Sequence, residues 1–148
     1  FCYLHLVTDS FSRMIIGYVL APTLEAKYTI EALQQAISHA GSGNLCGTIH
    51  HSDRGVQYCC DEYITLLKEH HIRISMTEDS NPTDNGMAER VNGIIKNEFL
   101  EPLQTPKNLL EAMPLVDHAV RTYNTLRPHL NLNMRTPAQV YEGKQIIL

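Results

Sequence analysis

His-Ser-Asp-Arg-Gly at residues 51–55 and Asn-Gly-Met-Ala-Glu-Arg at residues 85–90 each contain an acid, Asp53 and Glu89, next to an expected strand or helix. Asp53 follows a short apolar run, 47–50, that is typical of a strand, and Glu89 opens a helix after a loop rich in Asn, Pro, Asp and Gly. Both acids are therefore expected at the ends of elements, where the active sites of sheet proteins gather. Two carboxylates so placed suggest a metal site for phosphodiester chemistry.

Along the rest of the chain, the apolar periodicity predicts strands alternating with helices. We expect strands over 3–8, 14–20, 48–52 and 72–76, and helices over 23–40, 61–70, from Glu89 onward, and from Thr105-Pro106 to Arg127-Pro128. Residues 77–85 have the composition of a loop, and a last short turn or helix is expected from Thr136-Pro137.

The same periodicity predicts which side chains are buried. The expected inner positions are Ala26, Ile30, Leu33, Ile37 and Ala40 in the first helix, Tyr63, Leu66 and Leu67 in the second, Ile72, Ile74 and Met76 in the strand, and Leu109, Met113, Val116, Val120 and Tyr123 in the last long helix, which Pro114 should bend. At about 100° per residue, the helix at Glu89 places Glu89, Asn92, Gly93 and Lys96 on one side and Met87, Val91 and Ile94 on the other. We expect the first side to face the site and the second to pack.

Three motifs, in order, resemble a known family. Residues 51–58, His-Ser-Asp-Arg-Gly-Val-Gln-Tyr, and 81–98, which contain Glu89, resemble the second and third acid motifs of DDE-type transposases and retroviral integrases. Residues 123–129, Tyr-Asn-Thr-Leu-Arg-Pro-His, followed by Thr136-Pro137, resemble the end of the core of bacterial insertion-sequence transposases. The resemblance covers nearly the whole chain.

This resemblance implies one integrase-type catalytic core domain over residues 1–148, with the α/β, ribonuclease-H-like fold: a five-stranded mixed sheet flanked by helices. In that fold a central first strand carries the first acid, and this strand is missing ahead of the hairpin at 3–20. We expect the first Asp upstream of Phe1. Asp9 is the alternative, but its place between Thr8 and Arg13 favours a hairpin turn, where Asp bonds nearby backbone.

The chemistry that the resemblance implies is cleavage of DNA at the element's ends and direct attack of the new 3′-hydroxyl on target DNA. Two ions, Mg²⁺ or Mn²⁺, about 3.5–4 Å apart would act on the phosphate, and both prefer carboxylate oxygens. The missing Asp would bridge both ions, Asp53 would hold one and Glu89 the other. His51 is expected to support the site rather than to bind metal, because imidazole suits softer ions.

Several residues near the two acids are candidates for DNA contact. Lys96 and Asn92 lie on the side of Glu89, and Arg54 and Arg90 adjoin the two acids; the alternative for each is an ordinary solvated side chain. Gly93 suggests close approach by another group or tight helix packing. Further candidates for phosphate contact are Lys107, Arg121, Arg127 and Arg135.

Length, composition and charge limit the classes of protein to which the chain can belong. A chain of 148 residues with 43% hydrophobic residues can bury a core without the help of disulfide bonds or a structural metal ion. The formal charge of −4 argues against a protein that coats DNA nonspecifically. We expect no membrane span, a location in the bacterial cytoplasm with the nucleoid, DNA as partner and a homo-oligomer as the working form. The four cysteines have no zinc-site spacing, which predicts reduced, partly buried thiols.

Two alternatives to an active transposase core stay open. One is an inactive or domesticated DNA-binding or assembly domain of the same fold, which stays open because the first Asp is absent. The other is a host nuclease of that fold, which would not be expected to share the ending at 123–129. Because the central strand and its Asp are absent, residues 1–148 alone are expected to be inactive.

Overall fold

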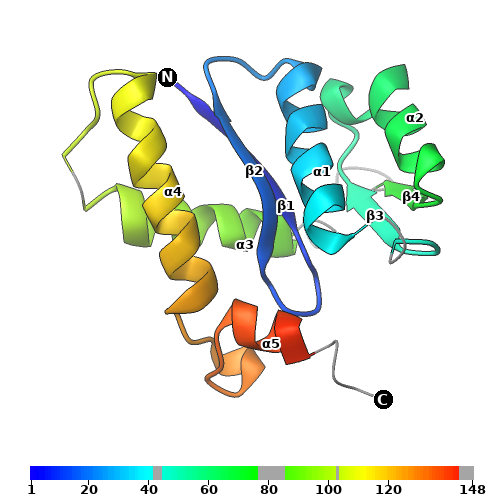
Figure 1. The fold of residues 1–148 in the computed structure, drawn as a ribbon. Coiled ribbons are helices and arrows are strands. Elements are labelled where there is room, and N and C mark those ends of the chain that lie inside the picture. The colour runs from blue at the N-terminus through cyan, green and yellow to red at the C-terminus, as the bar shows by residue number, and fades with distance from the viewer. Residues whose placement is uncertain (42–44, 77–85, 103, 144–148) are drawn as a thin grey trace. The chain divides into compact units, whose positions relative to one another are not determined.

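The computed structural model describes residues 1–41, 45–76, 86–102 and 104–143 (Figure 1). The chain forms two compact units, Phe1–Val7 with Ile16–Glu89 and Thr8–Ile15 with Arg90–Leu148. A single domain over 1–148 therefore stays a prediction. The loop expected over 77–85 lies outside the described residues.

Strands β1 (Tyr3–Thr8) and β2 (Ile15–Ala21) form a two-stranded sheet, which confirms the hairpin expected from the sequence (Figure 1). Strands β3 (Ile49–Ser52) and β4 (Arg73–Met76) form a second, parallel pair. Within the described residues no strand joins the two pairs. Parallel pairing brings the carboxyl ends of β3 and β4 side by side, and Asp53 follows directly after β3.

Helix α1 (Ala26–Ala40) touches β2 through a glycine. A Cβ atom at Gly17 would lie 2.1 Å from the carbonyl oxygen of Ala32, so the two backbones approach this closely only because position 17 has no side chain. This contact explains why small residues of α1 are buried at positions where we expected none. The predicted stripe is correct at Leu33 and Ile37, whereas its other three members are only half-buried.

The core of the first unit lies between α1 and helix α2 (Asp61–Glu69). Its buried members are Leu33, Ile37, Tyr63, Leu67 and Ile72, with Leu66 packed against them. The expectation for Ile74 was wrong, because its side chain is 37% exposed. Alternation decides the side of a strand on which a residue lies, but not whether another element covers it.

The second unit is built around helix α4 (Leu109–Thr125). Helix α3 (Gly86–Ile94), which belongs to this unit from Arg90 onward, continues into a π-helical segment, Ile95–Leu100, and both that segment and helix α5 (Pro137–Gly143) pack against α4. The buried face of α4 consists of Ala112, Val116, Ala119, Val120, Tyr123 and Asn124. Met113 is 44% exposed, so its predicted burial was wrong by one position.

Side-chain caps define where α4 and α5 begin. The long helix does not begin at Thr105-Pro106 as expected, because the Asn108 side chain accepts a hydrogen bond from the Glu111 N–H and starts α4 at Leu109. At α5, Thr136 and Gln139 exchange side chain to backbone bonds of 2.9 and 3.3 Å in a capping box. Helix α4 runs through Pro114 without interruption, and the predicted bend stays a prediction.

The four cysteines are free thiols, and only Cys60 is partly buried, so the expectation of partly buried thiols fails for the other three. Among the described helices, none has the length and apolar character that crossing a bilayer requires.

Candidate active site

Asp53 lies in a tight turn at the carboxyl end of β3. Its Oδ1 accepts a hydrogen bond of 2.7 Å from the Gly55 N–H, and the side chain is otherwise exposed. A Cβ atom at Gly55 would lie 2.8 Å from this Oδ1 and 2.9 Å from the Gln57 side chain, so glycine leaves room for the turn. The turn restrains this exposed carboxylate through one oxygen, Oδ1.

A cluster of one buried ring, Tyr63, and two half-buried rings, His50 and Tyr58, supports β3 just before Asp53. The hydroxyl of Tyr63 hydrogen-bonds to Nε2 of His50 at 2.8 Å, and the rings of Tyr58 and Tyr63 meet edge to face at 5.5 Å. Burial, with the nearby His51, lowers the pKa of His50 from 6.5 to about 4. Burial and then the charge of Asp53 raise the pKa of Tyr58. The neutral imidazole of His50 and the phenols of Tyr58 and Tyr63 therefore form an uncharged cluster near Asp53.

Two neighbours of Asp53 are exposed. His51 Nδ1 hydrogen-bonds to the hydroxyl of Ser75, its partner in the parallel register, at 3.0 Å. This contact joins β3 to β4, and the supporting role of His51 stays a prediction. The Arg54 side chain is exposed, as a residue that contacts DNA must be.

Glu89 lies in the first turn of α3, and its side chain is exposed. The two-sided pattern predicted for this helix is confirmed: Glu89, Asn92 and Lys96 are exposed, Val91 is buried and Met87 and Ile94 are half-buried. Arg90 is exposed as well. A Cβ atom at Gly93 would meet no described atom within 4 Å, so tight helix packing within the described residues does not explain this glycine. Close approach by another group stays a prediction.

The motif at residues 123–129 is a set of structural contacts within the second unit. The Tyr123 hydroxyl donates to the carbonyl of Arg13 at 2.8 Å. The buried Asn124 side chain accepts from the N–H of Ile15 and donates to its carbonyl, both at 2.9 Å. The sequence predicted that Tyr123 is buried, which is confirmed, but indicated no hydrogen-bond partner for either residue. Their contacts tie the end of α4 to the hairpin turn.

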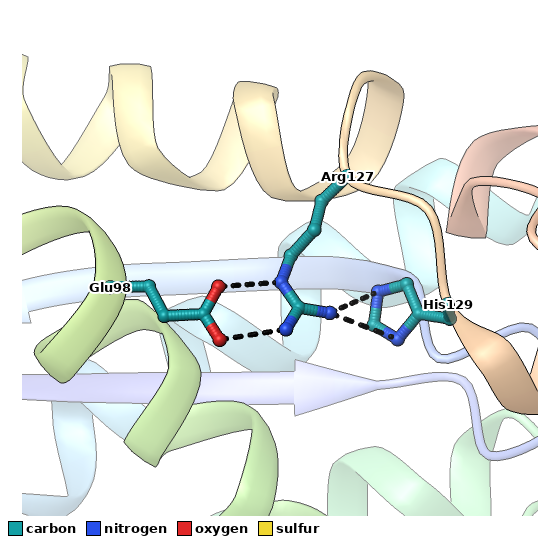
Figure 2. A network of polar contacts seen from close by, with 3 residues as sticks. All are labelled: Glu98, Arg127 and His129. Carbon is teal, nitrogen blue, oxygen red and sulfur yellow. Dashed lines mark hydrogen bonds and ion pairs between the residues drawn. The ribbon is translucent and has the colours of Figure 1, made fainter.

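Arg127 and His129 complete the motif. Figure 2 shows the Arg127 guanidinium between the Glu98 carboxylate and the His129 ring. Two bonds of 2.7 Å join Arg127 Nε and Nη2 to the two oxygens of Glu98. Arg127 therefore forms an ion pair within the protein, unlike the exposed Lys107, Arg121 and Arg135 of the same candidate group.

Asp9 serves the hairpin turn. Its Oδ2 accepts bonds from the N–H and the hydroxyl of Ser12, at 2.9 and 2.6 Å, and its carbonyl accepts from the Arg13 N–H. This is the local pattern expected of an Asp in a turn. Among the described residues, no group of three or more His, Cys, Asp or Glu side chains is arranged to hold a metal ion. Asp53 and Glu89 thus have no third ligand of these types in the described part of the chain.

Comparison with known proteins identifies the family. Two family models match, both described as integrase core domain, one over residues 1–82 and the other over residues 70–137. A putative transposase of insertion sequence IS986/IS6110 from Mycobacterium tuberculosis is 35% identical over 69% of this chain and 38% of its own length. The transposase of IS629 from Shigella sonnei is 31% identical over 94% of this chain and 46% of its own. The chain thus spans less than half of these relatives.

Solved structures agree on the fold. The catalytic core domain of HTLV-2 integrase, in complex with magnesium, has a TM-score of 0.72 and 28% identity, covering 94% of this chain and 84% of that one. A chain of a simian T-cell lymphotropic virus intasome, in complex with PP2A regulatory subunit B56 gamma, has a TM-score of 0.77 at 23% identity, covering 95% of this chain and 48% of that one. The mixed α/β, ribonuclease-H-like fold is confirmed. The chain belongs to the integrase core domain family.

Proposed function

We propose that this chain is the catalytic core of a bacterial insertion-sequence transposase, which cuts DNA at the ends of its element and joins them to target DNA. The observation that carries the proposal is the placement of two exposed acids in an integrase core fold: Asp53 after the carboxyl end of β3 and Glu89 in the first turn of α3. The relatives named as transposases support the same activity.

Asp53 and Glu89 fit a site for Mg²⁺ or Mn²⁺, because exposed carboxylate oxygens are the ligands that these hard ions prefer. The Gly55 N–H restrains one oxygen of Asp53 and leaves Oδ2 for a metal. Two bound ions would activate the attacking oxygen and stabilise the charge on the phosphate. We propose that a third carboxylate, from an Asp encoded upstream of Phe1, completes this set as the DDE motif of the family. The magnesium complex of the HTLV-2 core supports this choice of metal.

Four exposed side chains are proposed DNA contacts. Lys96, Asn92 and Arg90 lie on or just beyond the helix of Glu89, and Arg54 follows Asp53. Lys96 and the two arginines would bind phosphates by charge, which positions DNA without reading its sequence. Asn92 would orient a metal ligand or a base.

The proposed partners are the element's ends, the target DNA and further copies of the chain. The HTLV-2 core is described in a dimeric and a trimeric form, and the simian virus integrase within an intasome, which supports self-association around DNA. A bacterial transposase would act in the cytoplasm, at the nucleoid.

Residues 1–148 alone should show negligible strand transfer and weak binding of Mg²⁺ or Mn²⁺, because the described residues supply no third acid beside Asp53 and Glu89. Metal-dependent cleavage by this fragment, abolished by Asp53→Asn, would contradict that expectation and would point to Asp9.

The test uses the complete natural protein with duplex DNA that ends in the terminal repeat of its own element. Glu89→Gln should abolish Mg²⁺-dependent cleavage, because the amide loses the charge that holds the ion. Glu101→Gln is the matched control, since Glu101 is an exposed acid just beyond the π-helical segment. Equal activity of Glu89→Gln and wild type would refute the proposal.

A further inference from the structure

We propose that Glu98 and Arg127 are positioning residues: their ion pair fixes the π-helical segment Ile95–Leu100 and thereby holds Lys96 in the orientation in which it meets DNA. The inference rests on the proposed function, because it assigns a purpose to a contact beside a DNA-binding lysine. It gives the Arg-Pro-His part of the motif at 123–129 a role apart from the chemistry itself.

The pair has the geometry of a fixed contact. Both oxygens of Glu98 accept bonds of 2.7 Å, from Nε and Nη2 of Arg127, and the remaining nitrogen, Nη1, lies 3.5 Å from both ring nitrogens of His129 (Figure 2). The His129 ring in turn meets Tyr123 edge to face at 5.2 Å. A two-point bond between planar groups fixes direction as well as distance, which a lysine could not do.

The segment that this pair holds has an unusual backbone. Residues Ile95–Leu100 form a π-helix, in which the Glu101 N–H donates to the Lys96 carbonyl at 2.8 Å. Such turns are rare and occur often at functional sites. A π-turn shifts every later side chain around the axis relative to an α-helix, so side-chain contacts must maintain it. Ile95, fully buried, and Glu98, bonded to Arg127, are two such contacts.

Lys96 lies on the opposite side from Glu98. Residues two apart on a helix do not face each other, so a segment held at Arg127 through Glu98 directs Lys96 away from Arg127. Its side chain is exposed, as this geometry requires. Fixing Glu98 therefore fixes the direction in which the Lys96 side chain leaves the backbone.

The rival role for Arg127 is direct contact with phosphate. Arg13 and Arg90 lie near enough to lower the pKa of His129, after burial and Arg127 itself, so the region is basic. However, the three guanidinium nitrogens already face Glu98 and His129, and the Arg127 side chain is only 25% exposed. DNA would have to break a bidentate pair to reach it.

The experiment uses the complete natural protein and duplex DNA that ends in its terminal repeat. It compares two single variants, Glu98→Gln and Arg127→Lys, with a double variant that exchanges the pair, Glu98→Arg with Arg127→Glu. Glu101→Gln is the control. Glu98→Gln and Arg127→Lys should each lower kcat of end cleavage about ten- to a hundredfold, the cost of a slightly misplaced contact. KM should change much less. Amide exchange should speed up within 95–101 and nowhere else.

The exchanged pair should recover most of the lost kcat and of the exchange protection, and Glu101→Gln should behave as wild type. If Glu98→Gln is harmless and the exchanged pair stays inactive, Arg127 contacts DNA directly and the inference is overturned. A wild-type protein that does not cut DNA defeats the proposed function instead. Amide exchange still decides then, because protection equal to wild type in Glu98→Gln overturns the positioning role.

Discussion

Replacing His50 by phenylalanine should make the stability of the first unit less sensitive to acid. In the folded chain the imidazole is buried against Tyr63 and its pKa is about 4, whereas a free histidine has a pKa of 6.5. As the pH falls, the unfolded chain binds this proton first. The stabilisation is therefore fully present above pH 6.5 and is lost progressively as the pH falls toward 4.

The magnitude follows from the two pKa values. A difference of about 2.5 corresponds to a loss of about 3.4 kcal/mol once the pH lies below both values, and about 2 kcal/mol of it falls between pH 7 and pH 5. Other groups also titrate in this range, so the comparison must be with the His50→Phe variant. That variant also loses the partner of the Tyr63 hydroxyl, at a cost of about 1–3 kcal/mol that is the same at every pH.

Urea unfolding of both proteins at pH 7 and pH 5 measures the effect. The wild type should lose about 2 kcal/mol more than His50→Phe between the two pH values. An NMR titration of the His50 ring checks the origin of the difference. Parallel losses in the two proteins, or a ring that titrates near pH 6.5, would refute the buried neutral imidazole.

Two further substitutions, each with a control, test the packing and the hydrogen bonds. Gly17→Ala should lower the free energy of unfolding by about 3 kcal/mol or more in thermal unfolding, because its Cβ would lie 2.1 Å from a backbone oxygen of α1. The control Gly93→Ala, whose Cβ meets no described atom, should raise it by up to about 1 kcal/mol, and equal effects would contradict the close contact at Gly17. Asn124→Ala should lower the free energy of unfolding in urea by about 2–4 kcal/mol, because it leaves both backbone groups of Ile15 without their side-chain partner. The control Asn97→Ala, at an exposed position, should change it little, and similar losses in both variants would show that the Asn124 bonds do not stabilise the fold.

The sequence predicts the surroundings of the two acids because local patterns determine them. A run of strand-forming residues places Asp53 at the end of β3, and helical periodicity separates exposed Glu89 and Lys96 from buried Val91. Both expectations are confirmed. They depend on residues close together in the chain, whose sides of an element follow from its period.

Contacts between distant residues were not predictable in this way. Nothing local to Glu98 indicates that Arg127 binds it, and nothing near His50 indicates Tyr63. The start of α4 was misplaced because Thr105-Pro106 and Asn108 are both good starts for a helix. Only the bond from the Glu111 N–H to Asn108 decides between them.

A change of ligand chemistry at position 53 tests the proposal that Asp53 binds the catalytic metal. In the complete natural protein, Asp53→Cys should lose end cleavage with Mg²⁺ and regain part of it with Mn²⁺, which accepts a thiolate more readily. Asp61→Cys, at the exposed start of α2, is the matched control and should cleave as wild type with either ion. Full activity of Asp53→Cys with Mg²⁺ would contradict the account.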